Sequence, residues 1–444
     1  MRKDAKRMRY RGRATARHRR HGRLLRPLIA LATTPLVIAA CGSAGSSGTS
    51  ASGGSGSSAS HTITLGWEGS LTGPFGAISQ GQLHGLVVAS NAVNNAGGVV
   101  VNGVHYKFKW VFCNDNSDLT MVAACTQQLV HTDNVRFLFG GGGSHAPIVL
   151  KITQPAKVIF FTGSSAISDS VGINKSPYLI DTSSSGLARA TAGVLGLLHL
   201  YPTLKTVVWM GDQDSTSQAA EAALAPVLAQ YHVKLADVQY APSAATSFTS
   251  QMTVLKSYHP QVLLTEMSTP DRQNEVVTEN YQLGVAPAVF DNSTACSGQY
   301  ANSPGIPFIA NTTSGAITVG DHQTPGIENY ITQYFALKGA AGGNVADPSP
   351  YDLPPAQAQY DAVGMLAKAM ENAGTITDAK AIVAAINTLN YVGLNGPETI
   401  RNNQASYGLV LCVAPNGNGN GAGPDKEFEV YPNGTFSAYS ETGS

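Results

Sequence analysis

The chain has 444 residues, which at about 150 residues per domain predicts roughly three domains, or two large ones and a segment without a core. Hydrophobic residues make up 43% and charged residues only 13%, which excludes a disordered acidic chain. The net charge of zero hides an asymmetry, because residues 1–40 carry 12 of the 28 basic side chains and only one acid, so the remaining body is acidic and we expect no nucleic-acid partner.

The basic leader ends in an apolar run at residues 28–40, directly before Cys41. A basic region, a short apolar region and small residues before a cleavage site are typical of a secretory signal, and the run is too short for a comfortable membrane span. Residues 37–41 (VIAAC) resemble the lipobox of bacterial lipoproteins, whose cysteine is diacylated. We therefore expect residues 1–40 to be a lipoprotein signal peptide and Cys41 to be lipidated. A buried cysteine in a membrane anchor is the alternative, and the export route, Sec or twin-arginine, stays open.

Residues 42–60 contain only Gly, Ser, Ala and Thr. Such a segment buries no apolar surface and behaves as a flexible coil, with an average reach of about 24 Å. The lipidated cysteine and this tether, residues 41–61, predict an exported protein anchored to the outer face of the cell membrane.

From residue 63 onward, short apolar runs alternate with longer amphipathic runs. Strands are predicted at 63–67, 106–112, 135–139, 158–161, 206–210 and 262–265, and helices at 80–95, 119–130, 146–153, 216–231 and 271–283. This alternation predicts an α/β fold of two doubly wound, parallel-sheet lobes. Further helices are predicted at 329–338, 355–372 and 378–388, and strand-like runs at 407–414 and 427–431.

Four cysteines follow Cys41, and an exported chain meets an oxidising compartment, so two disulfides with three possible pairings are expected. Cys113 ends a predicted strand and Cys125 lies in the next predicted helix, which favours Cys113–Cys125 and leaves Cys296–Cys412 by elimination. A zinc site is the alternative, but no CxxC or HxxxH spacing supports it. We expect no metal and no cofactor.

Glycine-rich turns follow two neighbouring predicted strands. Residues 140–147 (GGGGSHAP) run into an apolar helix, with Ser144 placed to cap it. Glycines let the backbone approach a ligand, and the free amides of a first helical turn favour an anion, most simply a carboxylate. A phosphate loop, which lacks its Lys-Ser/Thr pair here, and a plain tight turn are the alternatives.

The next predicted strand is followed by residues 163–166 (GSSA). Ligands of open parallel sheets bind beyond the carboxyl ends of the strands, so the two turns are expected to converge on one small polar group. Helix capping by Ser164 and Ser165 is the alternative.

Motifs of common enzyme classes do not occur: the sequence has no GxSxG, HExxH or GxxxxGK[ST]. Ser144 is next to His145, but neighbours on a tight turn rarely reach nucleophile-to-base geometry. We expect no enzymatic activity.

Five short motifs together resemble one known family. They are residues 69–75 (GSLTGPF), 94–98 (NNAGG), the turn at 140–144, 163–165 (GSS) and 359–363 (QYDAV). In this order and near these intervals, residues 62–414 resemble the leucine/isoleucine/valine-binding protein family of type I periplasmic solute-binding proteins, which serve ABC importers.

The resemblance implies two lobes that are joined by a three-segment hinge and close on a ligand. The crossovers are expected near 181–186, 310–315 and 397–402. Lobe 1 would then comprise 62–183 plus 313–398, and lobe 2 would comprise 184–312 plus 399–444. This division places Cys296 and Cys412 in the same lobe.

The resemblance also implies ligand-binding residues. In that family the ligand's α-carboxylate is held at the turns that resemble Gly143-Ser144 and Ser164-Ser165-Ala166, where the common Thr falls on Ser165 or Ala166. The aromatic residue that packs over the ligand falls on Ile78, a departure. The second lobe commonly offers a Tyr and an acid to the α-ammonium, and here only acids match, namely Asp212, Asp214, Glu266 and Asp291. The three aspartates could equally be helix caps or turn residues.

These departures weaken a branched-chain amino acid as the ligand and leave a small solute. The sequence therefore predicts a monomeric, extracytoplasmic solute-binding lipoprotein that delivers a small carboxylate-bearing solute, such as an amino acid, to an ABC permease. The alternative is a sensor that uses the same lobes to report a ligand to a membrane partner.

Overall fold

The computed structural model describes residues 61–140, 142–163, 175–292, 308–312, 326–337, 353–394, 396–406, 409–414, 426–430 and 436–438. Residues 58–444 form one compact unit. The predicted signal peptide, Cys41 and the tether up to residue 60 lie outside the described residues. No helix in the described part of the chain is both long and apolar enough to cross a membrane.

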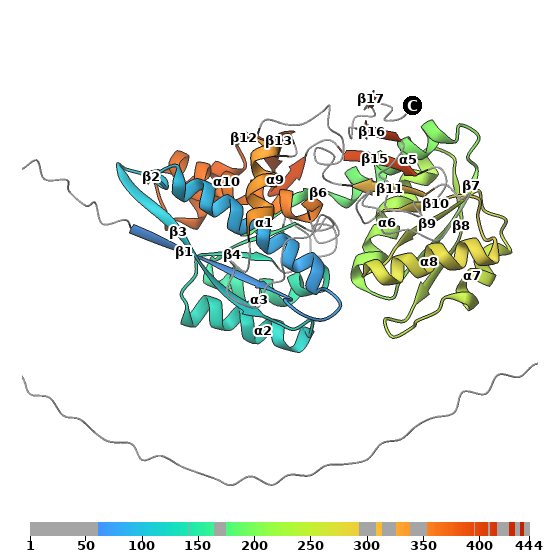
Figure 1. The fold of residues 1–444 in the computed structure, drawn as a ribbon, viewed down its shortest axis with the longest axis horizontal. Helices are drawn as coiled ribbons and strands as arrows, with labels where there is room; N and C mark the ends of the chain where they lie inside the picture. The colour runs from blue at the N-terminus through green and yellow to red at the C-terminus, as the bar shows by residue number, and fades with distance from the viewer. Residues whose placement is uncertain are drawn as a thin grey trace, which may run out of the picture. The chain divides into compact units, whose positions relative to one another are not determined.

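The first sheet has the strand order β12-β13-β14-β6-β5-β4-β1-β3-β2 (Figure 1). The pairs from β14 through β6, β5, β4 and β1 to β3 are parallel, and the pairs β12-β13, β13-β14 and β2-β3 are antiparallel. The central strands are β1 (His61–Gly69), β3 (Val104–Asn114), β4 (Phe137–Gly140), β5 (Ile159–Thr162) and β6 (Leu179–Ser184). The edge strands are β2 (Val99–Val101), β12 (Asn390–Gly393), β13 (Gly396–Arg401) and β14 (Gln404–Ser406).

Helices cover both faces of this sheet. On one face α1 (Gly76–Asn95) and α10 (Leu353–Ala373) pack against Phe139 and Phe161, and on the other α2 (Leu119–Gln127) and α3 (Ala146–Ala156) pack against Leu138 and Phe160. Because successive side chains of a strand point to opposite faces, β4 and β5 are nearly continuous apolar runs and are buried on both sides. Shorter helices in this part of the chain are η1 (Gln128–Thr132), η2 (Gly143–His145), α9 (Ile327–Ala336) and α11 (Ala379–Ile386).

The second sheet has the order β17-β16-β15-β11-β10-β9-β7-β8. Its parallel strands are β7 (Thr206–Asp212), β8 (Lys234–Ala241), β9 (Val262–Glu266), β10 (Val289–Asp291) and β11 (Phe308–Thr312). An antiparallel edge follows, with β15 (Leu409–Ala414), β16 (Lys426–Val430) and β17 (Phe436–Ala438). The helices here are α5 (Gly186–Leu200), α6 (Ser215–Gln230), α7 (Thr249–Lys256) and α8 (Pro270–Leu283). The predicted fold class is confirmed.

The third crossing between the sheets differs from the prediction. β13 and β14 pair with each other in the first sheet, and β15 pairs with β11 in the second, so the chain crosses between Ser406 and Leu409. The crossing expected near 397–402, and the lobe boundary at 398/399, are therefore wrong. The reason is a tight hairpin at Asn402 and Asn403, whose left-handed backbone turns β13 back into the first sheet as β14.

A disulfide joins Cys113, in β3, to Cys125, in α2, with their Cα atoms 5.4 Å apart. It is the strand-to-helix bridge predicted from the sequence. Cys296 and the side chain of Cys412 lie outside the described residues, so their pairing stays a prediction.

Candidate functional site

The glycine-rich turn after β4 lies at the carboxyl edge of the first sheet. Gly140 has φ +106, and a Cβ atom there would lie 2.0 Å from the carbonyl oxygen of Glu68, so glycine is what allows β4 to approach β1 at this point. The chain then forms η2, in which Gly143 has φ +44.

Ser144 lies inside η2 and does not cap α3, which corrects the sequence prediction. The short helix leads directly into α3, so His145 occupies the position before the first residue of α3, and no side chain caps that helix. Ser144 is half-buried. Within the described part of the chain its hydroxyl makes no hydrogen bond, so the group is available to a ligand.

The turn after β5 begins at Gly163, and the predicted site residues Ser164, Ser165 and Ala166 lie outside the described residues. Gln359 from α10 packs against this turn, because a Cβ atom on Gly163 would lie 2.7 Å from Gln359 Nε2. Gln359 is fully buried, yet neither atom of its amide has a hydrogen-bond partner in the part of the chain that the structure describes, and the same holds for Gln357. An unpaired buried polar group costs about 1–3 kcal/mol, so these amides indicate a place for a polar partner.

Gln359 was not identified as a site residue from the sequence. A glutamine among the apolar residues of a helix is the signal that could have found it, and only the structure shows that its amide lies at a strand end.

A second group of polar side chains gathers at the same edge: Glu68 at the end of β1, Asp115 just after β3, and His145 in η2. All three are buried. Burial raises the pKa of Glu68 to about 7, although its contact with His145 opposes this shift. Burial alone would lower the pKa of His145, but the hydrogen bond and charge of Glu68 and the charge of Asp115 outweigh it, so that pKa is raised. Their spacing along the chain gives no motif, since 77 residues separate Glu68 from His145.

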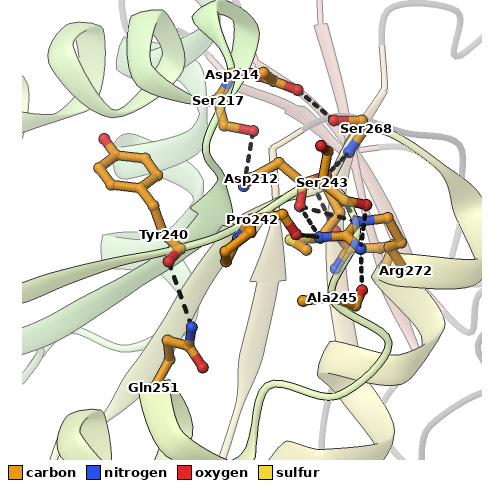
Figure 2. A network of polar contacts seen from close by, with 12 residues as sticks. Asp212, Asp214, Ser217, Tyr240, Pro242, Ser243, Ala245, Gln251, Ser268 and Arg272 are labelled. Atoms are coloured by element: carbon orange, nitrogen blue, oxygen red, sulfur yellow. Dashed lines mark hydrogen bonds and ion pairs between the residues drawn. The ribbon is translucent and has the colours of Figure 1, made fainter.

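The second sheet brings the predicted acids to its carboxyl edge, where β7, β9 and β10 are neighbours. Asp212 ends β7 and is held by Arg272, whose Nε lies 2.9 and 3.1 Å from its two carboxylate oxygens (Figure 2). The backbone N–H of Ser268 also donates to Asp212, at 2.8 Å. Asp212 is therefore already paired within the protein.

Asp214 caps α6: its carboxylate accepts a 2.8 Å hydrogen bond from the backbone N–H of Ser217 (Figure 2). It also accepts a hydrogen bond from the hydroxyl of Ser268. The helix-cap role weighed for Asp214 is thus present in the structure.

Glu266 and Asp291, at the ends of β9 and β10, are both buried. Asn292 Nδ2 donates to Glu266 Oε2 at 2.9 Å, and Arg189 Nη1 donates to the carbonyl oxygen of Asn292 at 2.7 Å. Burial raises the pKa of Glu266 to about 7, although the charge of Arg189 opposes the shift. The sequence did not point to Arg189, which lies in α5 far from any glycine-rich turn.

The last predicted ligand residue, Ile78, lies in the first turn of α1. Its side chain is outside the described part of the structure.

The sequence pattern of the periplasmic binding protein family matches residues 62–414. The chain belongs to this family. The resemblance drawn from the short motifs is thereby confirmed, and the family is one of binding proteins rather than enzymes.

Solved structures of similar fold include several solute-binding proteins. A solute-binding protein of an ABC transporter from R. palustris in complex with 4-hydroxybenzoate is 18% identical, with a TM-score of 0.63 over 81% of this chain and 94% of that one. The leucine-binding protein LivK from Thermotoga maritima is 16% identical, with a TM-score of 0.64 over 85% and 98%. LivJ from Streptococcus pneumoniae, in complex with isoleucine, is 16% identical, with a TM-score of 0.62 over 81% and 97%. At these identities the likeness shows the fold.

Proposed function

We propose that this periplasmic binding protein is an extracytoplasmic lipoprotein that captures a small carboxylate-bearing solute between its two lobes for an ABC importer. The observation that carries the proposal is the set of unpaired polar groups at the ends of β4 and β5. Among the residues that the structure describes, neither the hydroxyl of Ser144, in the turn after β4, nor the amide of Gln359, beside the end of β5, has a hydrogen-bond partner. A bound polar solute would supply the missing partners.

The donors at this edge suit a carboxylate. A serine hydroxyl, a glutamine N–H and the free backbone amides at the start of a helix all donate to an anion. The solved relatives of this fold include complexes with 4-hydroxybenzoate and with isoleucine, both carboxylate compounds.

The second lobe is less well suited to the ammonium group of an amino acid. Asp212 is engaged by Arg272, Asp214 caps α6, and Glu266 accepts a hydrogen bond from Asn292. With a pKa of about 7, Glu266 carries its negative charge only partly at neutral pH. We therefore include aromatic and aliphatic carboxylates, and not only amino acids, in the proposed ligand class.

The test uses residues 58–444, which form a compact unit. A thermal-shift panel of amino acids, amides, benzoates, other small carboxylates, sugars and polyamines should give a response to one carboxylate compound. A ligand at 100 times its Kd adds about 2.7 kcal/mol to the free energy of unfolding. A response only to sugars or polyamines, or none at all, would contradict the proposal.

Two variants test the site once a ligand responds. Ser144→Ala and Gln359→Ala should each weaken binding by about 1–3 kcal/mol, because each removes a buried hydrogen bond to the solute. Ser250→Ala, at an exposed position on α7, is the matched control and should leave the affinity unchanged. Unchanged affinity in both site variants would show that the solute binds at another place.

The anchor is tested separately. Two acyl chains on one cysteine are enough for stable membrane binding, so Cys41→Ser should release the chain into the soluble fraction without changing its affinity for the solute. Continued membrane association of the variant would contradict lipidation at Cys41.

A further inference from the structure

Three buried side chains from distant parts of the chain converge at the carboxyl edge of the first sheet. Nδ1 of His145 lies 3.4 Å from Glu68 Oε1, Glu68 Oε2 and Asp115 Oδ2. One ligand atom from each residue lies within 4.8 Å of the others. Glu68 and Asp115 are 0% exposed and His145 is 7% exposed.

Hydrogen bonding within the protein does not satisfy this cluster. Within the described residues, neither Glu68 Oε1 nor Asp115 Oδ2 forms a hydrogen bond. A ring nitrogen carries at most one hydrogen and can serve only one of the three oxygens, and 3.4 Å is longer than an ordinary N–H···O bond. Two carboxyl groups buried side by side are strongly unfavourable when both are ionised, and a bound cation would offset this cost.

The separations of the carboxylate oxygens from Nδ1 of His145 match those between the ligands of one small metal ion. An ion bound tetrahedrally at about 2.0–2.1 Å holds its ligand atoms about 3.3–3.4 Å apart. A histidine nitrogen and two carboxylate oxygens are ligand types of Zn²⁺, and three protein ligands with one open position are a common set for it. The two negative charges balance a divalent ion.

The surroundings also hold Asp115 in the orientation that a ligand needs. Its other oxygen, Oδ1, accepts a 2.5 Å hydrogen bond from the Ser70 hydroxyl and a 2.7 Å bond from the Ser117 backbone N–H. These bonds leave Oδ2 directed at His145, as outer-shell partners do for metal ligands. We propose that Glu68, Asp115 and His145 form a binding site for a divalent transition-metal ion of the zinc class.

The site would be separate from the solute itself, although His145 follows Ser144 directly. An ion bound there would tie the turn after β4 to the ends of β1 and β3. The proposal does not depend on which solute the protein captures.

Cobalt(II) is the probe, because its visible absorption is much stronger in tetrahedral than in octahedral sites. The full chain, purified in detergent and stripped with a chelator, should bind one Co²⁺ with strong visible bands that Zn²⁺ removes. Glu68→Gln and Asp115→Asn should each weaken binding about 100-fold or more. Asp118→Asn, an exposed neighbour that can still cap α2, and His131→Gln, at an exposed position, should leave it unchanged.

A wild-type chain without a saturable cobalt spectrum would overturn the proposal. So would a spectrum that Glu68→Gln and Asp115→Asn, shown to be folded by circular dichroism, leave intact. If those variants do not fold, crystals of the wild-type chain grown with Zn²⁺ decide the question: an anomalous peak between the three side chains supports the site, and its absence there rejects it.

Discussion

Arg272 and Asp212 form a buried ion pair at the carboxyl edge of the second sheet. Their side chains are 15% and 1% exposed. The guanidinium also donates to the carbonyl oxygens of Pro242 and Ser243 (Figure 2). It lies 5.0 Å from the centre of the Phe248 ring. Arg272 thus joins the end of β7 to the loop after β8.

Removing one partner of this pair should destabilise the fold. Asp212→Asn leaves the partly buried Arg272 charge without its counterion; the loss of a fully buried partner costs about 3–5 kcal/mol, and we expect about 2–3 kcal/mol here because Arg272 keeps its carbonyl acceptors. Urea unfolding of residues 58–444, followed by circular dichroism, measures the change. The exposed pair Lys368 and Glu371 is the matched control, and Glu371→Gln should cost no more than about 1 kcal/mol. Equal losses in the two variants would show that burial does not strengthen the Asp212 pair.

Much of the fold could be predicted from the sequence because buried parallel strands are continuous apolar runs. Phe137–Phe139 and Ile159–Phe161 are such runs, and both are central strands of the first sheet. β12, β13 and β14 were missed because short edge strands such as Gly396–Arg401 carry polar residues and a proline, without a regular alternation. This is also why the third crossing was placed too early.

The candidate site could be predicted only where a local motif marks it. The turn after β4 can be recognised in the sequence by its run of glycines. At Gly140 a glycine is required, because a Cβ atom there has no room. The partners of Asp212 and of Glu68 are not visible, because Arg272 lies 60 residues beyond the first and His145 lies 77 residues beyond the second. Only the packing of strands and helices brings such residues together.

Gly140 and Gly142 give a matched pair in one turn. At Gly140 a Cβ atom would meet the Glu68 carbonyl oxygen at 2.0 Å, and φ is +106, whereas a Cβ atom at Gly142 has nothing within 4 Å. We expect Gly140→Ala to lower the free energy of unfolding by about 1–3 kcal/mol or more, and Gly142→Ala to change it by less than about 1 kcal/mol. Thermal and urea unfolding of both variants measure this. A loss at Gly142 as large as that at Gly140 would contradict the steric argument.

The disulfide between Cys113 and Cys125 should contribute measurably to stability. It closes a loop with a sequence separation of 12, for which the chain-entropy estimate is about 3 kcal/mol. The double variant Cys113→Ser, Cys125→Ser should therefore unfold at a lower urea concentration. The control is a titration of free thiols in both chains, unfolded without reducing agent. Cys113 and Cys125 are bonded in the wild type and replaced in the variant, so the two chains should show the same number of free thiols. An unchanged unfolding midpoint would refute the stabilising role.

Glu266 predicts a specific dependence of stability on pH. Its pKa is about 7 in the folded protein, raised by burial, compared with about 4.3 in an unfolded chain. Arg189 and Asn292 face the carboxyl group and favour its charged form, while Asp291 and Asp214 disfavour it. Below pH 4 both states hold the proton. As the pH rises from about 4.3 to 7, the unfolded state loses its proton first, so the contribution of Glu266 to stability falls and is lost above pH 7.

Glu266→Gln removes this titration and keeps an oxygen that can accept from Asn292. The variant should match the wild type at pH 4 and exceed it at pH 8, by an amount on the order of 3 kcal/mol, since one pKa unit corresponds to about 1.4 kcal/mol. Urea unfolding at the two pH values gives the comparison, and Glu371→Gln serves as the control for loss of a carboxylate at the surface. If the pH 4 to pH 8 difference of Glu266→Gln equals that of the wild type, the buried carboxyl group does not take up a proton on folding, and the charge of Arg189 holds it ionised throughout.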